Sequence, residues 1–103
     1  MVVVLVHHYC KPGTLEQAIR RLDANGERMA TFPGFLFRQR LSCEEQPLRL
    51  STVTAWDEAK DYEHWLAVRR SGDPGPAFAG ESPYERTVTE LCTVDRVHEP
   101  LPD

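Results

Sequence analysis

The fold of this chain is decided by the stretch TVTAWDEAKDYEHW, which covers residues 52–65. Its first five residues are β-branched or aromatic except for one alanine, a composition typical of a strand. Asp57 then predicts a helix N-cap, and Glu58 in the first turn suits the positive end of the helix dipole. An apolar helix face follows at the i, i+3 and i+4 spacing, made of Tyr62, Trp65 and Leu66. The stretch therefore predicts a strand that passes directly into a helix packed on a sheet.

Three more strands are expected around this one. Residues 2–10 begin with a run of Val and Leu, typical of a central strand buried on both faces. Residues 35–43 and 48–56 are separated only by the polar loop 44–47, so we expect them to be antiparallel neighbours. Residues 84–97, rich in Thr and Val, predict a fourth strand that is longer than a small sheet needs.

Strict alternation in the second strand assigns its side chains to two faces. It places Phe35 and Phe37 on one face, and Leu36, Arg38 and Arg40 on the other. The arginines of the chain are scattered, and the doublets Arg20-Arg21 and Arg69-Arg70 fit the solvated side of a helix.

A long first helix is expected over residues 15–29, whose apolar residues recur at helical spacing. Thr14 and Gln17 predict a capping box at its start. Gly26 lies on the apolar face, and we interpret it as a point where another segment approaches the helix closely. The alternative is that the helix ends at Gly26 with a glycine C-cap.

Two segments near the C-terminus lack a clear periodic pattern. Residues 71–83 hold three glycines and three prolines and predict a long loop, with a short turn around residues 77–79. Residues 98–103 predict a tail. The remainder forms one domain, so residues 1–103 are expected to be a single unit.

The order βαββαβ predicts an α+β, ferredoxin-like fold: a four-stranded antiparallel sheet with both helices on one face. The other face carries large apolar side chains and has nothing in the chain to cover it. An uncovered apolar sheet face is an interaction surface. We therefore expect a homodimer in which two sheets enclose a barrel-like interior, a dimeric α/β barrel.

Composition excludes several classes of function. The formal net charge of −4, without a basic cluster, argues against nucleic acid as a partner. The apolar N-terminal run is too short to span a membrane and has no positively charged leader. Cys10, Cys43 and Cys92 show no ligand spacing, which predicts reduced thiols in a cytoplasmic protein and no metal site.

Three motifs give the chain a resemblance to the antibiotic biosynthesis monooxygenase superfamily, over residues 2–97. They are Lys11-Pro12-Gly13 after the first strand, Phe32-Pro33-Gly34-Phe35 before the second, and the stretch 52–65. The resemblance implies a dimeric α/β barrel. It also implies an enzyme that oxidises a small aromatic, polyphenolic substrate to a quinone with O₂, without a metal, flavin or other cofactor.

The same resemblance implies site residues. Trp56 and Tyr62 match the family's tryptophan at the end of the third strand and its tyrosine six residues later. Thr52 stands where those relatives place an asparagine. A haem-degrading branch uses a tryptophan that Trp65 resembles, together with an asparagine and a histidine that this chain lacks at the matching positions. Because these two residues are missing, the sequence predicts that the protein does not degrade haem.

The residues themselves add a possible base. His7 and His8 are adjacent in one strand and point to opposite faces, so one of them faces either the helices or the dimer interior. A histidine there could titrate near neutrality and take a proton from the substrate; the alternative is a hydrogen-bonded structural histidine. Trp65, Phe37 and Phe78 are candidates for substrate contacts, Phe78 as a lid from the loop.

These observations predict a monooxygenase-like oxidoreductase. An isomerase or decarboxylase on a similar pocket is the first alternative. A non-catalytic dimer that binds a small ligand is the second. The substrate itself is not encoded in any pattern of the sequence.

Overall fold

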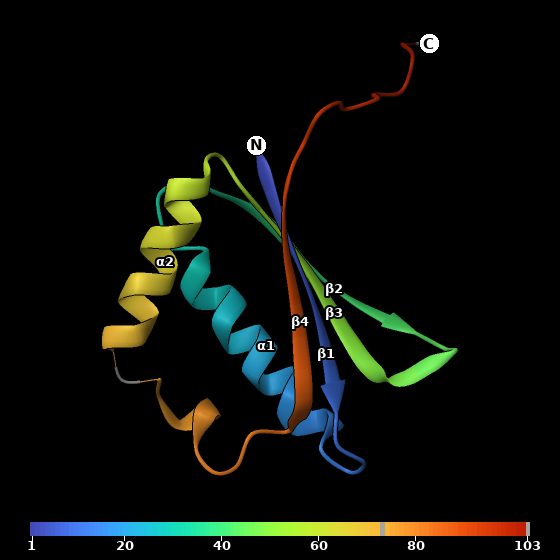
Figure 1. Cartoon of the computed structure of the whole chain (residues 1–103), viewed down its shortest axis with the longest axis vertical. Helices are drawn as coiled ribbons and strands as arrows, with labels where there is room; N and C mark the ends of the chain where they lie inside the picture. Colours follow the sequence, from blue (N-terminus) through green and yellow to red (C-terminus); the bar gives the residue numbers. More distant parts are fainter. Residues whose placement is uncertain (73, 103) are drawn as a thin grey trace.

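The computed structural model describes residues 1–72 and 74–102 and has the expected order of elements. Its helices and strands are β1 (Val2–Cys10), α1 (Leu15–Met29), β2 (Phe35–Cys43), β3 (Gln46–Trp56), α2 (Ala59–Ser71), the short 3₁₀ helix η1 (Pro76–Phe78) and β4 (Tyr84–Thr93). The strands form one antiparallel sheet in the order β2-β3-β1-β4. Both helices lie on one side of this open sheet (Figure 1), which confirms the ferredoxin-like α+β fold.

The even-numbered residues of β1 and β3 face the helices. The register pairs Val4 with Thr54 and Val6 with Thr52, so these side chains share one face. Two apolar clusters pack there. One contains Val2, Val4, Met29, Trp56 and Trp65, and the other contains Cys10, Ala18, Leu22 and Leu50.

A bulge in β2 changes the expected side-chain directions. Phe35 pairs with Trp56, while Phe37 pairs with the next residue, Ala55. Leu36 is therefore an extra residue, and the alternation restarts after it. The prediction that Phe35 and Phe37 share a face is wrong: Phe35 packs against the core beside Trp56, and Phe37 points to the opposite face.

α1 runs unbroken through Gly26, so the interpretation of Gly26 as an interior residue is confirmed. The Cβ that glycine lacks would lie 3.2 Å from Cδ of Arg38, which makes Gly26 a point of close approach. The expected capping box of Thr14 and Gln17 is absent. Instead, Thr14 Oγ1 donates to the carbonyls of Lys11 and Pro83, and Gln17 Nε2 donates to the Glu81 carbonyl.

Three boundaries differ from those expected. Glu58, rather than Asp57, is the N-cap of α2, because its backbone N–H is held by the Asp61 carboxylate at 3.0 Å in a capping box. The β2–β3 connection is two residues shorter than expected, since β3 begins at Gln46. β4 ends at Thr93 instead of residue 97, where its pairing with β1 runs out at Val2.

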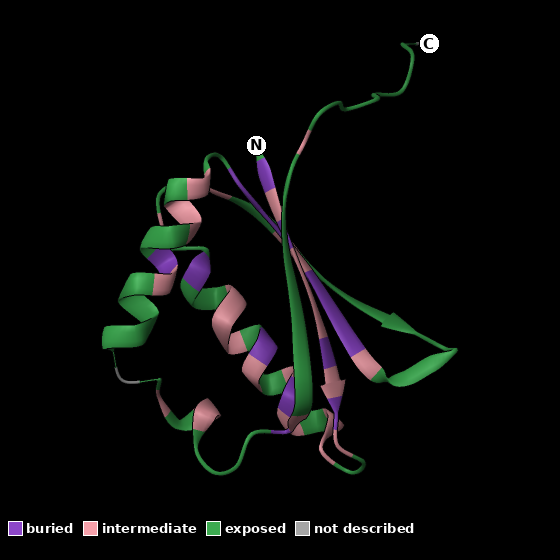
Figure 2. Cartoon of the chain, viewed as in Figure 1, coloured by how far each residue is buried: buried purple, intermediate pink, exposed green. Residues whose placement is uncertain are grey.

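The second face of the sheet has no helix over it among the described residues (Figure 1). Its strands β2 and β4 are exposed along most of their length (Figure 2). Apolar residues on this open face are Val3, Leu5, Phe37, Leu41, Val53 and Val88. In the described part of the chain, no helix is long and apolar enough to cross a membrane.

Gly34 provides a test of how β2 is fixed to α2. Its φ is +85°, and a Cβ there would collide with the side chain of Asp61, the residue that caps α2. Gly34→Ala should lower the free energy of unfolding by about 2–4 kcal/mol, from backbone strain plus the loss of the cap. Denaturant unfolding measures this value.

Gly13→Ala is the matched control, because Gly13 has φ of +82° with nothing within 4 Å of the added Cβ. It should cost only the backbone strain, about 1 kcal/mol. Equal losses in the two variants would contradict the role of the Gly34–Asp61 contact.

Candidate functional site

A cavity of about 410 Å³ lies between the helix-covered face of the sheet and the two helices. The sheet contributes residues of β1, β3 and β4 to it, and β2 contributes Arg38. Leu22, Asn25 and Met29 of α1 and Tyr62, Trp65 and Leu66 of α2 form the opposite side. Phe78 of η1 also lines it. The cavity contacts both apolar clusters, so it lies where the core is divided.

Aromatic rings hold one side of the cavity in place. Trp56 is fully buried, with the ring of Phe35 edge-on at 5.6 Å and the ring of Tyr62 at 6.4 Å between centroids. Trp65 is edge-on to Phe32 at 5.1 Å. Aromatic pairs of this geometry fix ring orientation as well as burying apolar area. The cavity therefore has a rigid aromatic wall made of Trp56, Tyr62 and Trp65.

Polar atoms of the same residues are left without partners. Thr52 Oγ1, Trp56 Nε1 and Trp65 Nε1 are buried and have no hydrogen-bond partner within the described part of the chain. A buried polar group left unpaired costs about 1–3 kcal/mol, so it requires an explanation such as a ligand or water. An indole N–H can only donate. These atoms are thus unpaired polar groups of residues that line the cavity.

Arg38 enters the cavity from β2, with the central part of its side chain against Gly26 of α1. Its Nη1 donates to Thr54 Oγ1 at 3.0 Å and contacts Met29 Sδ at 3.2 Å, and its Nη2 donates to the Leu22 carbonyl at 3.5 Å. Burial lowers the pKa of Arg38 below its ordinary value. A guanidinium in this position is a strong hydrogen-bond donor at the wall of the cavity.

Sequence reasoning did not identify Arg38 as a site residue. The assigned alternation was correct in separating Arg38 from Phe37, but it did not show which face the helices cover. The register settles this, because Arg38 pairs with Thr54, and Thr54 faces the helices. The available signal was Gly26, a residue without a side chain on an apolar helix face, which indicated that something approached it.

His8 is the histidine that lines the cavity. Its Nδ1 donates to the Leu50 carbonyl at 3.2 Å, which leaves Nε2 as an acceptor in the neutral ring. Burial, with smaller effects from Arg38, His7 and Arg69, lowers the pKa of His8 to about 4. The expected titration near neutrality is therefore wrong for His8, which is neutral at pH 7.

His7 and Phe37 lie on the open face of the sheet instead. His7 Nδ1 is 2.6 Å from Ser51 Oγ, a residue that faces away from the helices. Phe37 is 41% exposed and does not line the cavity. Neither side chain can contact a ligand held between the sheet and the helices.

The loop before β4 is held over the cavity by Arg21. The Nη2 of Arg21 lies 3.1–3.4 Å from the carbonyls of residues 78–81. Its guanidinium carbon is 5.6 Å from the centroid of Phe78. Arg21 was expected on the solvated side of the helix; it is half-buried instead, because it satisfies the loop's carbonyls.

The predicted site residues thus fall into two groups: His7 and Phe37 lie on the open face of the sheet, and the others line the cavity. Thr52, Trp56, Tyr62, Trp65, His8 and Phe78 all line the cavity, and their catalytic or substrate-binding roles remain predictions. The residues that sequence reasoning missed there include Arg21, Asn25, Arg38, Arg69 and Tyr84. Burial raises the pKa of Tyr84 to about 12, and its ring lies 5.0 Å from that of His8.

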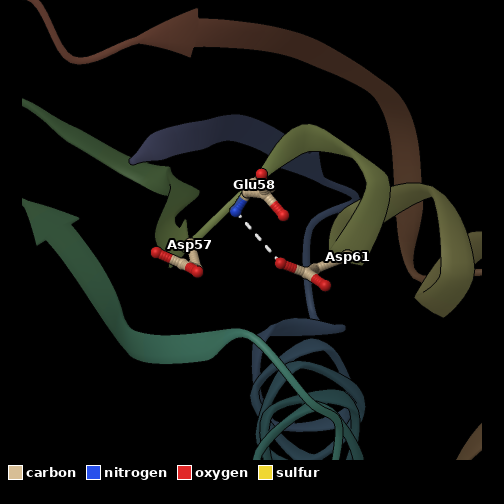
Figure 3. A group of neighbouring side chains, drawn as sticks. All are labelled: Asp57, Glu58 and Asp61. Atoms are coloured by element: carbon tan, nitrogen blue, oxygen red, sulfur yellow. Dashed lines mark hydrogen bonds between the residues drawn. The ribbon is translucent and has the colours of Figure 1, made fainter.

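Asp57, Glu58 and Asp61 form the one group of potential metal ligands in the described residues (Figure 3). Two of these carboxylates already have partners at the start of the helix. The Asp61 carboxylate accepts a hydrogen bond from the backbone N–H of Glu58, and the Lys60 ammonium forms an ion pair with the Glu58 carboxylate at 2.9 Å. They lie at the exposed N-terminus of α2. We assign no metal site to them.

Solved structures similar to this chain include a heme-degrader and a cofactor-independent oxygenase. The heme-degrader MhuD from Mycobacterium tuberculosis, with two hemes bound, is 19% identical, with a TM-score of 0.72 over 96% of this chain and 100% of that one. A MhuD variant with manganese protoporphyrin IX bound is 16% identical, with a TM-score of 0.81 over 97% and 100%. SnoaB, a cofactor-independent oxygenase from Streptomyces nogalater, is 16% identical, with a TM-score of 0.71 over 99% and 98%.

At these identities the similarity shows a shared fold and leaves the activity open. No curated protein matches the chain. The family model for antibiotic biosynthesis monooxygenases matches residues 1–70, which is more than half of the sequence and includes β1 to β3 and most of α2. The chain therefore belongs to the antibiotic biosynthesis monooxygenase family.

Proposed function

We propose that this protein is a cofactor-independent monooxygenase that converts a small phenolic substrate to a quinone with O₂. The observation that carries the proposal is the cavity beside Trp56 and Tyr62, with the unpaired buried atoms of Thr52, Trp56 and Trp65. A site of this kind combines an aromatic wall with fixed polar groups that can orient a ligand. Membership of the family supports the same class of reaction.

The proposed reaction balances without a reductant. A phenol with hydrogen at its para carbon reacts with one O₂. One oxygen atom becomes the new quinone carbonyl, and the other leaves as water with the two hydrogens that the substrate loses. The substrate supplies all four electrons, so neither flavin nor metal is needed for the balance.

The residues of the cavity would act on the substrate as its phenolate. An electron-rich phenolate is the form that reacts with O₂, and donors placed around its oxygen stabilise it. The indole N–H groups and Thr52 are such donors, and Tyr62 would orient the ring. His8, neutral at pH 7, would accept a hydrogen bond at Nε2 instead of holding the substrate's proton.

The assembly and location belong to the same proposal. The open face of the sheet, with six apolar residues and no helix over it in the described part of the chain, suits a second copy of this chain. Such a homodimer would bind a small aromatic molecule in each protomer, with no role for nucleic acid. Free Cys10, Cys43 and Cys92 support a cytoplasmic location.

Oxygen uptake tests the proposed reaction. The chelator-treated protein is mixed with naphthol or hydroxynaphthoate, and O₂ consumption is followed together with quinone absorbance. One labelled atom from ¹⁸O₂ should enter each quinone. Tyr62→Phe should lower kcat/KM at least about ten-fold, because it removes the hydroxyl with which Tyr62 would hydrogen-bond and orient the substrate. Tyr9→Phe, the same change on the opposite sheet face, should leave kcat/KM unchanged.

Other outcomes would replace the proposal. Turnover without O₂ would indicate an isomerase or decarboxylase. Ligand binding without turnover would leave a binding protein. O₂ consumption only with haem and a reductant would indicate haem degradation.

The low pKa of His8 predicts a pH dependence of stability. Below about pH 6.5 the unfolded chain gains a proton on His8, and the folded chain does not gain it until about pH 4. The free energy of unfolding should therefore fall as the pH drops through this window. His8→Gln should remove that part of the dependence in denaturant titrations. His64→Gln, which changes an exposed histidine, should keep it; identical slopes in both variants would contradict the burial of a neutral His8.

The dimer is tested by placing a charge on the open face. Phe37→Glu should shift the protein to monomers in sedimentation velocity, because it would bury a charge between the two apolar faces. Val68→Glu on α2 is the matched control, since Val68 has the same exposed fraction, 41%. A wild-type monomer at micromolar concentration would overturn the dimer.

A further inference from the structure

The charged groups of the cavity are all of one sign. Arg21, Arg38 and Arg69 line it, and no Asp or Glu of the described residues does so. Arg86 is also at its edge, but its guanidinium lies 4.0 Å from the ring centroid of Tyr9, on the other face of the sheet. The whole chain carries a net charge of −4, so this positive region is local to the cavity.

Within the part of the chain that the structure describes, the guanidinium of Arg38 forms hydrogen bonds with neutral groups. Its hydrogen bonds go to the Thr54 hydroxyl, the Met29 sulfur and the Leu22 carbonyl, the last at 3.5 Å. Ion pairs among the described residues join Arg40 to Asp23 and Lys60 to Glu58, and neither includes Arg38. A partly desolvated cation is costly unless an anion pairs with it.

The position of Arg38 is built into the fold. Gly26, on the apolar face of α1, leaves room for the Arg38 side chain, whose Cδ and Nε lie 3.2 and 3.4 Å from the place of a Cβ. A Cβ there would be in tight contact with the arginine, which would have to move by a few tenths of an ångström. A buried Leu or Met would fill the space between the two apolar clusters better than an arginine does. Packing alone therefore does not explain an arginine at this position, opposite a glycine.

The three arginines act on the same region of the cavity. Arg21, Arg38 and Arg69 each favour the ionised form of Tyr84, and Arg38 and Arg69 disfavour protonation of His8. Their positive potentials therefore overlap beside these two rings. A negative group of a ligand would be stabilised there most strongly.

We infer that the ligand of this cavity is an aromatic carboxylate, whose ring lies against Trp56, Tyr62 and Trp65 and whose carboxylate is bound by Arg38. The inference rests on the proposed function for the reaction, and it adds the substrate class. Arg38 is the binding residue, because its neutral partners use three of its five N–H groups and leave donors on Nη2 and Nε for a carboxylate. Arg21 and Arg69, the latter exposed at the end of α2, make the electrostatic potential of the cavity more positive. Neither needs to contact the carboxylate directly.

Binding of two isosteric probes tests the inference. Naphthoate and its neutral counterpart naphthamide are titrated into the wild-type protein at pH 7 by calorimetry. Naphthoate should bind at least about ten-fold more tightly than naphthamide, the size expected of one charge-assisted pair. Equal binding of both probes, or no binding of naphthoate at millimolar concentration, would overturn the inference.

Substitutions locate the preference on Arg38. Arg38→Met keeps an unbranched apolar side chain and removes the guanidinium and its charge, so the ratio of the two affinities should fall to about one. Arg40→Met removes the same charge from the same strand, where Arg40 forms an exposed pair with Asp23. It should preserve the ratio. A preference that survives in Arg38→Met, or disappears in Arg40→Met, would contradict the assignment.

Arg38→Lys keeps the experiment decisive if Arg38→Met fails to fold. It retains the positive charge but loses the two-pronged geometry, so the preference for naphthoate should fall several-fold without vanishing. An unchanged preference would overturn the role of the guanidinium. Thermal unfolding of each variant checks that the folded state is populated during the titration.

The readouts separate this inference from the proposed oxygenase activity. Oxygen uptake is compared between hydroxynaphthoate and naphthol for the wild type and Arg38→Met. Selective binding without oxygen uptake would overturn the oxygenase and leave the carboxylate site. Oxygen uptake with equal kcat/KM for both substrates would overturn the carboxylate site and leave the oxygenase.

Discussion

The structure depends on a core that is divided into two apolar clusters with a cavity between them. One apolar cluster joins the first half of β1 to Trp56 and α2, and the other joins the end of β1 to α1. Between them the helix-facing residues of β3 are polar, namely Thr52 and Thr54. Threonine hydroxyls and a guanidinium cannot replace apolar packing, so the helices rest on the two clusters and a cavity remains between them.

The sequence predicted the elements well because they follow from local chemistry. β-branched runs, helical spacing and the Pro-Gly turns determine where chains of this kind extend or coil, and β1, α1 and β2 have the expected bounds. The direction of Arg38 toward the helices could not be predicted in the same way. It depends on the bulge at Leu36 and on pairing with Thr54, which are properties of a neighbouring strand.

The same distinction explains the errors at the helix ends and on the surface of α1. A threonine before a helix can cap it or bond elsewhere, and Thr14 bonds to Lys11 and Pro83 because the chain returns to that point before β4. Arg21 looked like a solvated residue because its partners, the carbonyls of residues 78–81, are far away in the sequence. Both residues bind the loop that carries Phe78. The loop is thus fixed to α1 by contacts that no local pattern encodes, and so is one boundary of the cavity.

The threonine at position 52 changes the hydrogen-bonding groups that the cavity offers to a ligand. Threonine in place of the asparagine expected from the family resemblance offers one hydroxyl where an amide would offer both a donor and an acceptor. Thr54 lies two residues further along β3 on the same face, and it accepts a hydrogen bond from Arg38. The guanidinium of Arg38 therefore adds N–H donors to the cavity. Unlike an amide, a guanidinium supplies donors only and carries a full charge. A site altered in this direction loses acceptors and gains positive charge, and this is the physical basis of the inference that its ligand carries a negative group.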